Sequence, residues 1–301
     1  MPGRALTLLA IALLAAPAGH ADTAQVERLF LERTAISAAD ASCNLFTESE
    51  RLALKAGLYQ TEGELLRANY SPEKLASLAK DVRAHAKSLG CDHPSVLEVA
   101  STIRSSYRAF TKTIYLDYVA AHSSWGASRA ADDAWGVVQE DKASGVKFGL
   151  RRGDEFEDLK LAITMPAKGA QPSSVQLIMR DAKKMADPWV GKMFGADGSV
   201  TLPPRSVTRP EWAGDEEDGT DGRNNPTWIY YFSQPALDRL EGLDPREMVQ
   251  IELTPSPRAK DQKPVRIVFE TGDLRAAHAF SLIPKPAASA LAAAEPAKPA
   301  H

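Results

Sequence analysis

The sequence predicts an α+β protein in which an N-terminal antiparallel helical bundle is followed by an antiparallel β-sandwich or open barrel. From Thr23 to about Ala121, apolar residues recur at intervals of three and four, which is the period of an amphipathic helix. After His122, apolar and polar residues alternate, as in strands with one face on a core and one in water. The expected organisation is a signal peptide (1–21), a helical bundle (22–122), a strand-rich domain (123–283) and a disordered Ala/Pro/Lys tail (284–301).

The first segment has the three parts of a secretory signal. Arg4 provides a positive start, residues 5–16 form an apolar stretch, and Gly19 and Ala21 are small residues before a cleavage site. The apolar stretch covers about 18 Å as a helix, short of a bilayer core of roughly 30 Å, which favours cleavage over anchoring. No later apolar run is long enough to span a membrane. We therefore expect a periplasmic or secreted protein without a membrane span after cleavage.

The chain has only two cysteines, Cys43 and Cys91. In an oxidising compartment such a pair predicts one disulfide, and closing a loop of about 50 residues contributes on the order of 4 kcal/mol in the chain-entropy model. The alternative is a redox pair or a metal site built from Cys91, Asp92, His93 and His85. No CxxC motif or paired metal-ligand spacing supports that alternative, so we expect no metal and no cofactor.

Four helices are expected in the first half. The first runs toward Cys43, and Thr47 with Glu50 forms a capping box that opens the second. Ser71 and Pro72 begin the third, and the fourth begins at Pro94 with an apolar stripe that continues to Ile114 and Tyr118. Their short connections predict antiparallel neighbours.

Seven or eight strands are expected in the second half, with two short helices at 233–240 and 273–280. The strands with the clearest alternation or apolar character are 135–140, 146–150, 158–163, 175–180, 228–232, 249–253 and 265–270. Between them, residues 181–226 show no sustained period and contain several prolines, so we expect a long loop there.

An acidic segment, residues 215–225, lies within that expected loop. It has five carboxylates and one arginine, and oxygen ligands of this kind suit Ca²⁺. The spacing differs from an EF-hand, because a glycine comes at the fifth position instead of the sixth and no glutamate follows at the twelfth. A solvated loop kept open by like-charge repulsion is favoured. Weak calcium binding and a contact site for a basic partner remain the alternatives.

Several short motifs carry a resemblance. They are Trp125-Gly126-Ala127-Ser128-Arg129, Trp135-Gly136-Val137-Val138-Gln139, Leu243-Asp244-Pro245-Arg246-Glu247 and Gly272-Asp273-Leu274-Arg275-Ala276-Ala277. Together with the two cysteines, this layout resembles a group of uncharacterised exported proteins of alphaproteobacteria. The resemblance implies a cell-envelope setting and no assigned activity.

Catalytic motifs are missing from the sequence, which has no HExxH, P-loop, dinucleotide-binding or kinase signature. The segment around Ser128 is one residue away from the hydrolase elbow GxSxG, but it lacks the strand before and the helix after that the elbow needs. The densest aromatic and cationic group is Trp125, Arg129 and Trp135. An arginine between indoles can hold an anion or a sugar face. Alternatively, these large side chains serve packing between the two halves.

The function that follows is a non-enzymatic periplasmic binding or interaction protein of the cell envelope. Its partner would be an envelope protein, a polymer or a small ligand, and the net charge of −3 argues against nucleic acid. The alternative is an exported hydrolase that acts on cell-wall or other polymers through carboxylates of the strand-rich half. No catalytic residue can be chosen from the sequence.

Overall fold

The computed structural model describes residues 22–284, except 111, 154–157, 169, 191–199 and 258–262. The predicted signal peptide, and the predicted tail apart from Pro284, lie outside these residues. The chain divides into two compact units: a helical unit, made of the described residues up to Ile114 together with 282–284, and a strand-rich unit, Tyr115–Ser281. The fold is α+β, as predicted, and no closed barrel is present in the described part.

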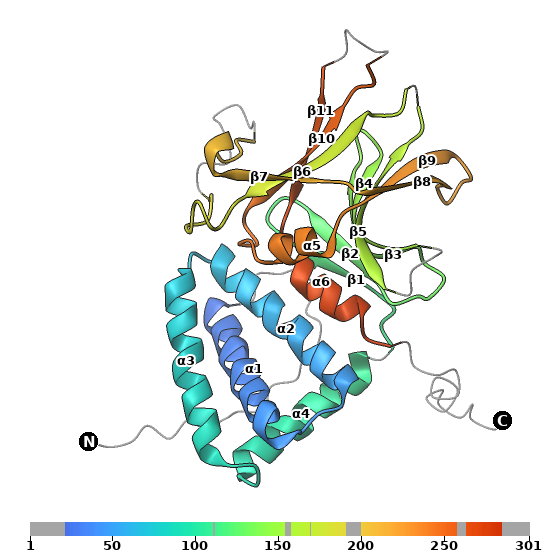
Figure 1. Cartoon of the computed structure of the whole chain (residues 1–301). Coiled ribbons are helices and arrows are strands. Elements are labelled where there is room, and N and C mark those ends of the chain that lie inside the picture. The colour runs from blue at the N-terminus through green and yellow to red at the C-terminus, as the bar shows by residue number, and fades with distance from the viewer. Residues whose placement is uncertain are drawn as a thin grey trace, which may run out of the picture. The chain divides into compact units, whose positions relative to one another are not determined.

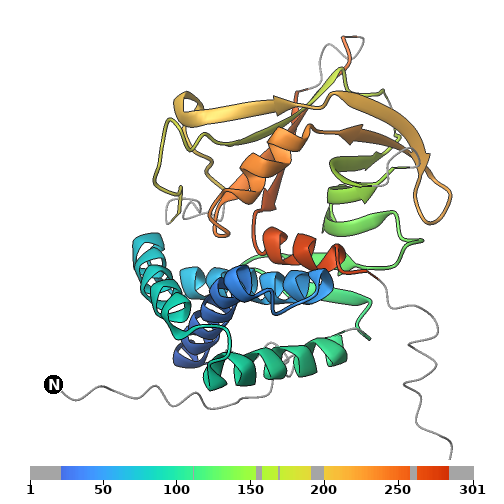
Figure 2. The same ribbon diagram turned by 60° about the horizontal axis from the view of Figure 1, so that its bottom comes forward.

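The helical unit contains the four expected helices. They are α1 (Thr23–Cys43), α2 (Glu48–Arg67), α3 (Pro72–Leu89) and α4 (Pro94–Phe110). Helix α1 contacts each of the other three, and Figures 1 and 2 show it among them. The predicted starts are confirmed: Thr47 and Glu50 form a capping box, and the Ser71 side chain accepts a hydrogen bond from the Lys74 amide.

Two apolar clusters hold this unit together, and α1 contributes to both. One joins α1 to α2 and α3 through Phe30, Leu65 and Leu75, and the other joins α1 to α2 and α4 through Ile36 and Val96 among others. Each fully buried side chain of this size contributes roughly 1.5–3 kcal/mol relative to exposure.

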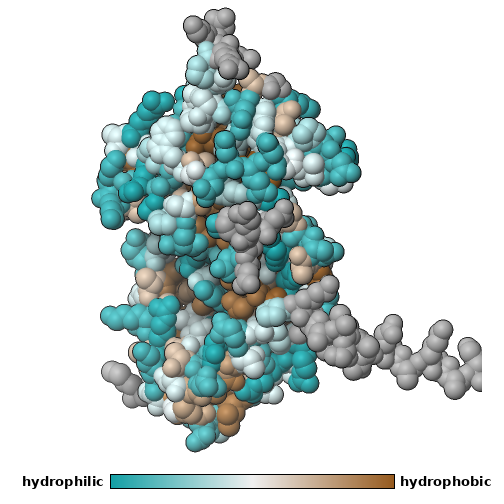
Figure 3. Space-filling view, turned by 45° about the vertical axis from the view of Figure 1, so that its right-hand side comes forward, coloured by the Kyte–Doolittle hydropathy of each residue, from teal (hydrophilic) through white to brown (hydrophobic). Residues whose placement is uncertain are grey.

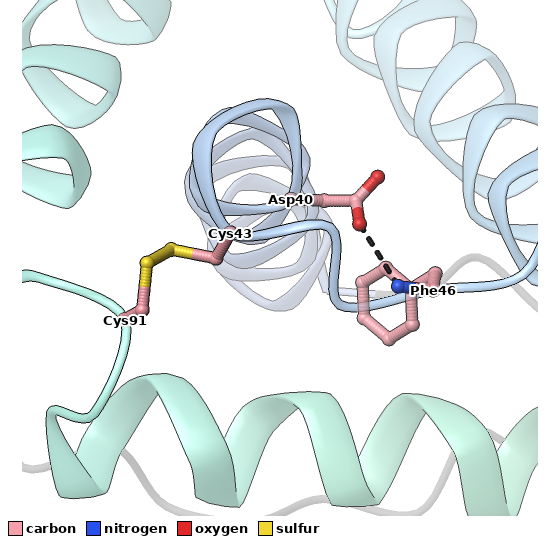
Figure 4. Close-up of a disulfide and its surroundings, with 4 residues drawn as sticks. All are labelled: Asp40, Cys43, Phe46 and Cys91. Atoms are coloured by element: carbon pink, nitrogen blue, oxygen red, sulfur yellow. Dashed lines mark hydrogen bonds between the residues drawn. A yellow bond between two sulfur atoms is a disulfide. The ribbon is translucent and has the colours of Figure 1, made fainter.

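The predicted disulfide is present between Cys43 and Cys91, whose Cα atoms are 5.4 Å apart. It joins the end of α1 to the turn after α3 (Figure 4). On the other side of the same helix end, Asp40 accepts a hydrogen bond from the Phe46 amide at 2.9 Å. The covalent bond and this hydrogen bond fix the chain where it leaves α1.

The strand-rich unit contains two antiparallel sheets and two helices. The seven-stranded sheet has the order β1 (Tyr115–Val119), β2 (Ser124–Ser128), β3 (Trp135–Asp141), β4 (Val146–Arg152), β5 (Leu159–Pro166), β9 (Pro226–Tyr231) and β8 (Asp215–Thr220). The four-stranded sheet has the order β11 (Val265–Glu270), β10 (Met248–Thr254), β6 (Ser174–Arg180) and β7 (Thr208–Trp212). The helices are α5 (Gln234–Glu241) and α6 (Leu274–Ser281) (Figure 1).

One face of the seven-stranded sheet, which we call the inner face, forms the core of this unit. Helix α6 packs on β1, β2 and β3, and the rings of Tyr118 and Phe280 lie 6.2 Å apart. Phe148 of β4 contacts both Trp125 and Phe269, with ring centroids 6.1 and 5.1 Å away, so it links the two sheets. The opposite, outer face is the one that carries the candidate site.

The β1–β2 hairpin replaces the last part of the expected fourth helix. Helix α4 ends at Phe110, and Tyr118 belongs to a strand, so the prediction of a continuous helical stripe to Tyr118 is wrong. The reason is a long-range interaction. The buried carboxylate of Glu270 accepts hydrogen bonds from the amides of Ala121 and His122, each at 2.9 Å, and thereby holds the hairpin turn.

The long loop expected between 181 and 226 is also wrong, because β7, β8 and the start of β9 lie within it. Pro210 is compatible with β7 because this strand lies at the edge of its sheet, where one amide is not needed. The acidic segment is likewise not a loop. Residues 215–220 pair with β9 in regular register, and only residues 221–225 form the turn of a hairpin.

Candidate ligand-binding site

The outer face of the seven-stranded sheet brings together charged and aromatic side chains from five strands. Cross-strand partners share a face, and Trp135 lies opposite Arg151, which lies opposite Lys160. Two residues along β5, Ala162 lies opposite Tyr231, which lies opposite Asp215. Because side chains alternate along a strand, all of these groups face the same side.

Tyr231 is the centre of this group. Its hydroxyl accepts a hydrogen bond from Arg151 Nη1 at 2.6 Å and donates one to Glu217 Oε2 at 2.9 Å. Burial, and then the hydrogen bond to Glu217, raise the pKa of Tyr231 to about 12. The phenol therefore stays protonated at neutral pH, and the Arg151–Tyr231–Glu217 chain of hydrogen bonds holds its ring in one orientation.

A small apolar cluster lies around the ring. Ala162, Ile229 and Tyr231 are buried together, and half-buried Trp135 packs against them. The cluster keeps water from the base of the site, while Arg151, Lys160 and Glu217 remain partly accessible above it. Electrostatic contacts there act in a less polar medium than on an open surface.

A pocket of about 220 Å³ opens beside Tyr231. The side chains that give it chemical character are those of Lys160, Trp212, Asp215, Tyr231, Ser233 and Gln234. Trp212 ends β7, and the short turn to β8 places it next to Asp215, while Ser233 and Gln234 begin α5. The pocket thus combines an ammonium, a carboxylate, an amide, a hydroxyl and an indole.

Trp212 is the most unusual member, because it is 58 % exposed. On the face drawn in Figure 3 hydrophilic residues predominate and hydrophobic ones form separate patches. A large indole left in water next to a charged pocket is typical of binding surfaces, where tryptophan is enriched.

The structure does not bring together the three residues that the sequence singled out. Trp125 is fully buried and donates from Nε1 to the Thr271 carbonyl at 2.9 Å, and Arg129 is 3 % exposed with its guanidinium 5.6 Å from the centre of the Phe280 ring. Both lie on the inner side, toward α6. Trp135 lies on the outer face, at the border of the candidate site. A binding role for the three residues remains a prediction.

Sequence reasoning missed Arg151, Lys160, Trp212, Glu217 and Tyr231 as site residues. The alternation of apolar and polar residues did place Lys160 on the polar face of its strand, and this was the signal from which it could have been chosen as a site residue. The pairing order of the strands, which brings β8 and β9 next to β5, cannot be obtained from alternation alone.

Metal binding and membrane insertion find no support in the described residues. No group of three or more His, Cys, Asp or Glu side chains among them could hold a metal ion. Among the helices that the structure describes, none combines the length and apolar composition that a membrane span requires.

Comparison of the chain with protein-family models, curated proteins and solved structures finds no match. The resemblance to exported proteins therefore stays a prediction.

Proposed function

We propose that this chain is a non-enzymatic binding protein of the cell envelope, periplasmic or secreted, that holds a ligand in the pocket beside Tyr231. The observation that carries the proposal is the exposed indole of Trp212 at a pocket rimmed by Lys160, Asp215 and Gln234. An indole provides an apolar surface for stacking, and the polar groups around it provide direction.

The dimensions and chemistry limit the ligand. A pocket of about 220 Å³ is smaller than the roughly 300–1,000 Å³ of sites for drug-sized ligands, so it suits one ring or one short side chain of a larger molecule. The Lys160 ammonium offers donors, and the Asp215 carboxylate offers an acceptor. A small polar unit with one apolar face, such as a sugar ring or an amino-acid unit of an envelope polymer, matches this set.

The setting is supported by three features. The signal peptide predicted for residues 1–21 and the resemblance to exported proteins both favour the envelope. The Cys43–Cys91 disulfide agrees with an oxidising compartment.

The test is a ligand screen on the purified mature chain. Sugars, amino acids and soluble peptidoglycan fragments are screened by thermal shift, and hits are titrated by calorimetry. We expect one class to stabilise the wild type and to lose most of its affinity in Trp212→Ala. Tyr115→Ala is the matched control, since Tyr115 is 65 % exposed on β1 at the opposite edge of the sheet. A screen without any hit, or equal losses in both variants, contradicts the proposal.

A hydrolase is the second candidate, favoured by one observation. Asp215 and Glu217 are two residues apart on β8 and face the same side, so the strand rise places their Cα atoms about 7 Å apart. Inverting glycosidases use two carboxylates that are likewise several ångströms apart on one face of the site. Turnover of a polysaccharide or glycoside that disappears in both Asp215→Asn and Glu217→Gln would replace the binding proposal by this one.

A further inference from the structure

The free edge of β8 is the second surface of interest. This strand ends the seven-stranded sheet, so only β9 pairs with it. Four of its six residues are acidic, from Asp215 to Asp218. Asp215 and Glu217 face the pocket side described above, whereas Glu216 and Asp218 face the other side. We call the latter two side chains, with their outward backbone groups, the acidic edge.

The hydrogen-bond pattern shows which backbone groups are available. At the hairpin turn the Asp221 amide donates to the Asn225 carbonyl, so this pair is hydrogen-bonded. On the other side of β9, the Pro226 carbonyl accepts from Ala167 beyond β5. Since hydrogen-bonded and non-bonded pairs alternate in an antiparallel ladder, Glu217 and Gly219 bond to β9. The N–H and C=O groups of Glu216 and Asp218 consequently point away from it, at the free edge.

A buried hydroxyl provides an independent observation. Tyr230 lies directly opposite Glu216 in the register and is only 4 % exposed. Its hydroxyl makes no hydrogen bond of normal geometry within the described residues, and the nearby Gln171 side chain makes only a looser polar contact with it. Gln171 in turn donates to Glu216 at 3.3 Å. Buried hydroxyls normally have a partner, so this one marks a position where a hydrogen-bonding group is expected.

The charge of the edge limits what that group can be. Within the described ranges, no Lys, Arg or His forms an ion pair with Glu216 or Asp218. A metal ion is not favoured, because those ranges contain no group of three metal-binding side chains. A second copy of the chain is also not favoured, since pairing β8 with β8 would place like charges opposite each other. An ammonium or guanidinium group, which supplies donors to two carboxylates and a phenol oxygen, satisfies all of them.

We infer that the acidic edge binds an extended basic segment of a partner protein by strand addition. The partner's backbone pairs with the outward groups of Glu216 and Asp218, and a lysine or arginine side chain lies between these carboxylates and the Tyr230 hydroxyl. Main-chain bonds supply affinity and the alternate basic side chains supply specificity. The site is on the opposite side of β8 from the Trp212 pocket, so it does not depend on the function proposed above.

The test uses fluorescein-labelled peptides and fluorescence anisotropy on the mature chain. The probe is a short peptide in which lysine alternates with threonine. The control peptide has glutamate in place of every lysine. We expect saturable binding of the lysine peptide only. Two further versions of the lysine peptide carry methyl groups on alternate backbone nitrogens, one version for each of the two alternating sets. The version whose methyl groups face β8 should bind about tenfold or more weakly, because its donors to β8 are removed.

Variants of the protein complete the test. Glu216→Gln and Asp218→Asn should each weaken the lysine peptide by about tenfold, which corresponds to one charge-assisted contact. Tyr230→Phe should also weaken it while leaving the melting temperature of the free protein unchanged or higher, because the variant removes a hydroxyl that has no partner. Asp117→Asn on β1, at the opposite edge of the same sheet, is the matched control and should bind normally.

Several results would overturn the inference. Absence of binding at millimolar peptide would do so, as would equal losses in Asp117→Asn and Glu216→Gln, which would indicate general charge attraction. Charge-dependent binding that tolerates methylation in both registers would exclude strand addition. Trp212→Ala should leave this binding intact, so a failure here is distinguishable from a failure of the proposed pocket.

Discussion

The ion pair between Arg180 and Glu247 is the most deeply buried one in the described part of the chain, and its removal gives a sharp prediction. Arg180 ends β6 and Glu247 immediately precedes β10. The two side chains are only 4 % and 2 % exposed. The guanidinium contacts both carboxylate oxygens, Nε to Oε1 at 2.6 Å and Nη2 to Oε2 at 2.8 Å.

Other polar groups complete the arrangement. Arg180 Nη1 donates to the Met185 carbonyl at 2.6 Å, and Glu247 accepts from the amides of Trp189 and Asp244 at 3.0 and 3.1 Å. The hydrogen bond to Glu247 raises the pKa of Arg180 further above its ordinary value. The pair therefore fastens the segment after β6 to the turn before β10.

Glu247→Leu should destabilise the strand-rich unit by about 3–5 kcal/mol, because it leaves a buried guanidinium without its counter-charge. At about 2–4 °C per kcal/mol for a domain of this size, the melting temperature falls by roughly 6–20 °C. Urea unfolding monitored by tryptophan fluorescence measures this loss of stability in the strand-rich unit, since all five tryptophans lie within Tyr115–Ser281.

The double variant Arg180→Met, Glu247→Leu separates charge burial from packing. Replacing both partners by apolar side chains of similar size is often neutral, so we expect it to recover most of the stability lost in the single variant. A single variant within about 1 kcal/mol of wild type would refute the reasoning, as would a double variant no better than the single one.

Three further predictions concern the disulfide and two titrating groups. Reduction of Cys43–Cys91 should lower the stability of the helical unit by about 4 kcal/mol, measured by far-UV circular dichroism, and peptide mapping without reductant should find the two linked. Burial raises the pKa of Asp40, but the hydrogen bonds that it accepts, foremost from Arg51, lower it below the ordinary value. Its contribution is therefore present above about pH 4 and lost on acidification, and Asp40→Asn should reduce the acid sensitivity of the helical unit. Because the pKa of Tyr231 is raised, its contribution to the stability of the strand-rich unit is complete below about pH 10 and is lost as the pH rises toward about 12. The difference between the ultraviolet titration curves of the wild type and Tyr231→Phe should therefore show one phenol with a pKa near 12.

The helices could be predicted well because their signals are local. A cap such as Thr47 or Ser71 acts on amides two or three residues away. The apolar residues of each helix recur every three or four positions, so this pattern is visible within the helix itself. The error at β1 has the opposite cause. Its pairing with β2 depends on Glu270, about 150 residues farther along the chain, and no local pattern reports that contact.

The acidic strand β8 was missed because its residues have low intrinsic preference for strands. Consecutive carboxylates are unfavourable in a central strand, where like charges would meet cross-strand neighbours. At a sheet edge they are tolerated, and they prevent unwanted association with other edges. Sequence reasoning placed the charges in water correctly, but it could not supply the neighbour, β9, that makes the segment a strand.

The candidate site shows how one extra residue can redirect a side chain. The sequence groups Trp125 and Trp135 with Arg129 because the three are close together in the chain. Strict alternation would also place Trp135 on the same face as Val137, toward the inner side where Trp125 lies. In the structure Val137 pairs with Leu150 but Trp135 pairs with Arg151, because Gly136 forms a bulge between them. A side chain at Gly136 would lie 2.6 Å from Leu159 Cδ1, so only glycine fits there without displacing Leu159. The bulge turns Trp135 to the outer face, where it packs against the cluster of Ala162, Ile229 and Tyr231 at the border of the site, and this placement is therefore a consequence of a single glycine.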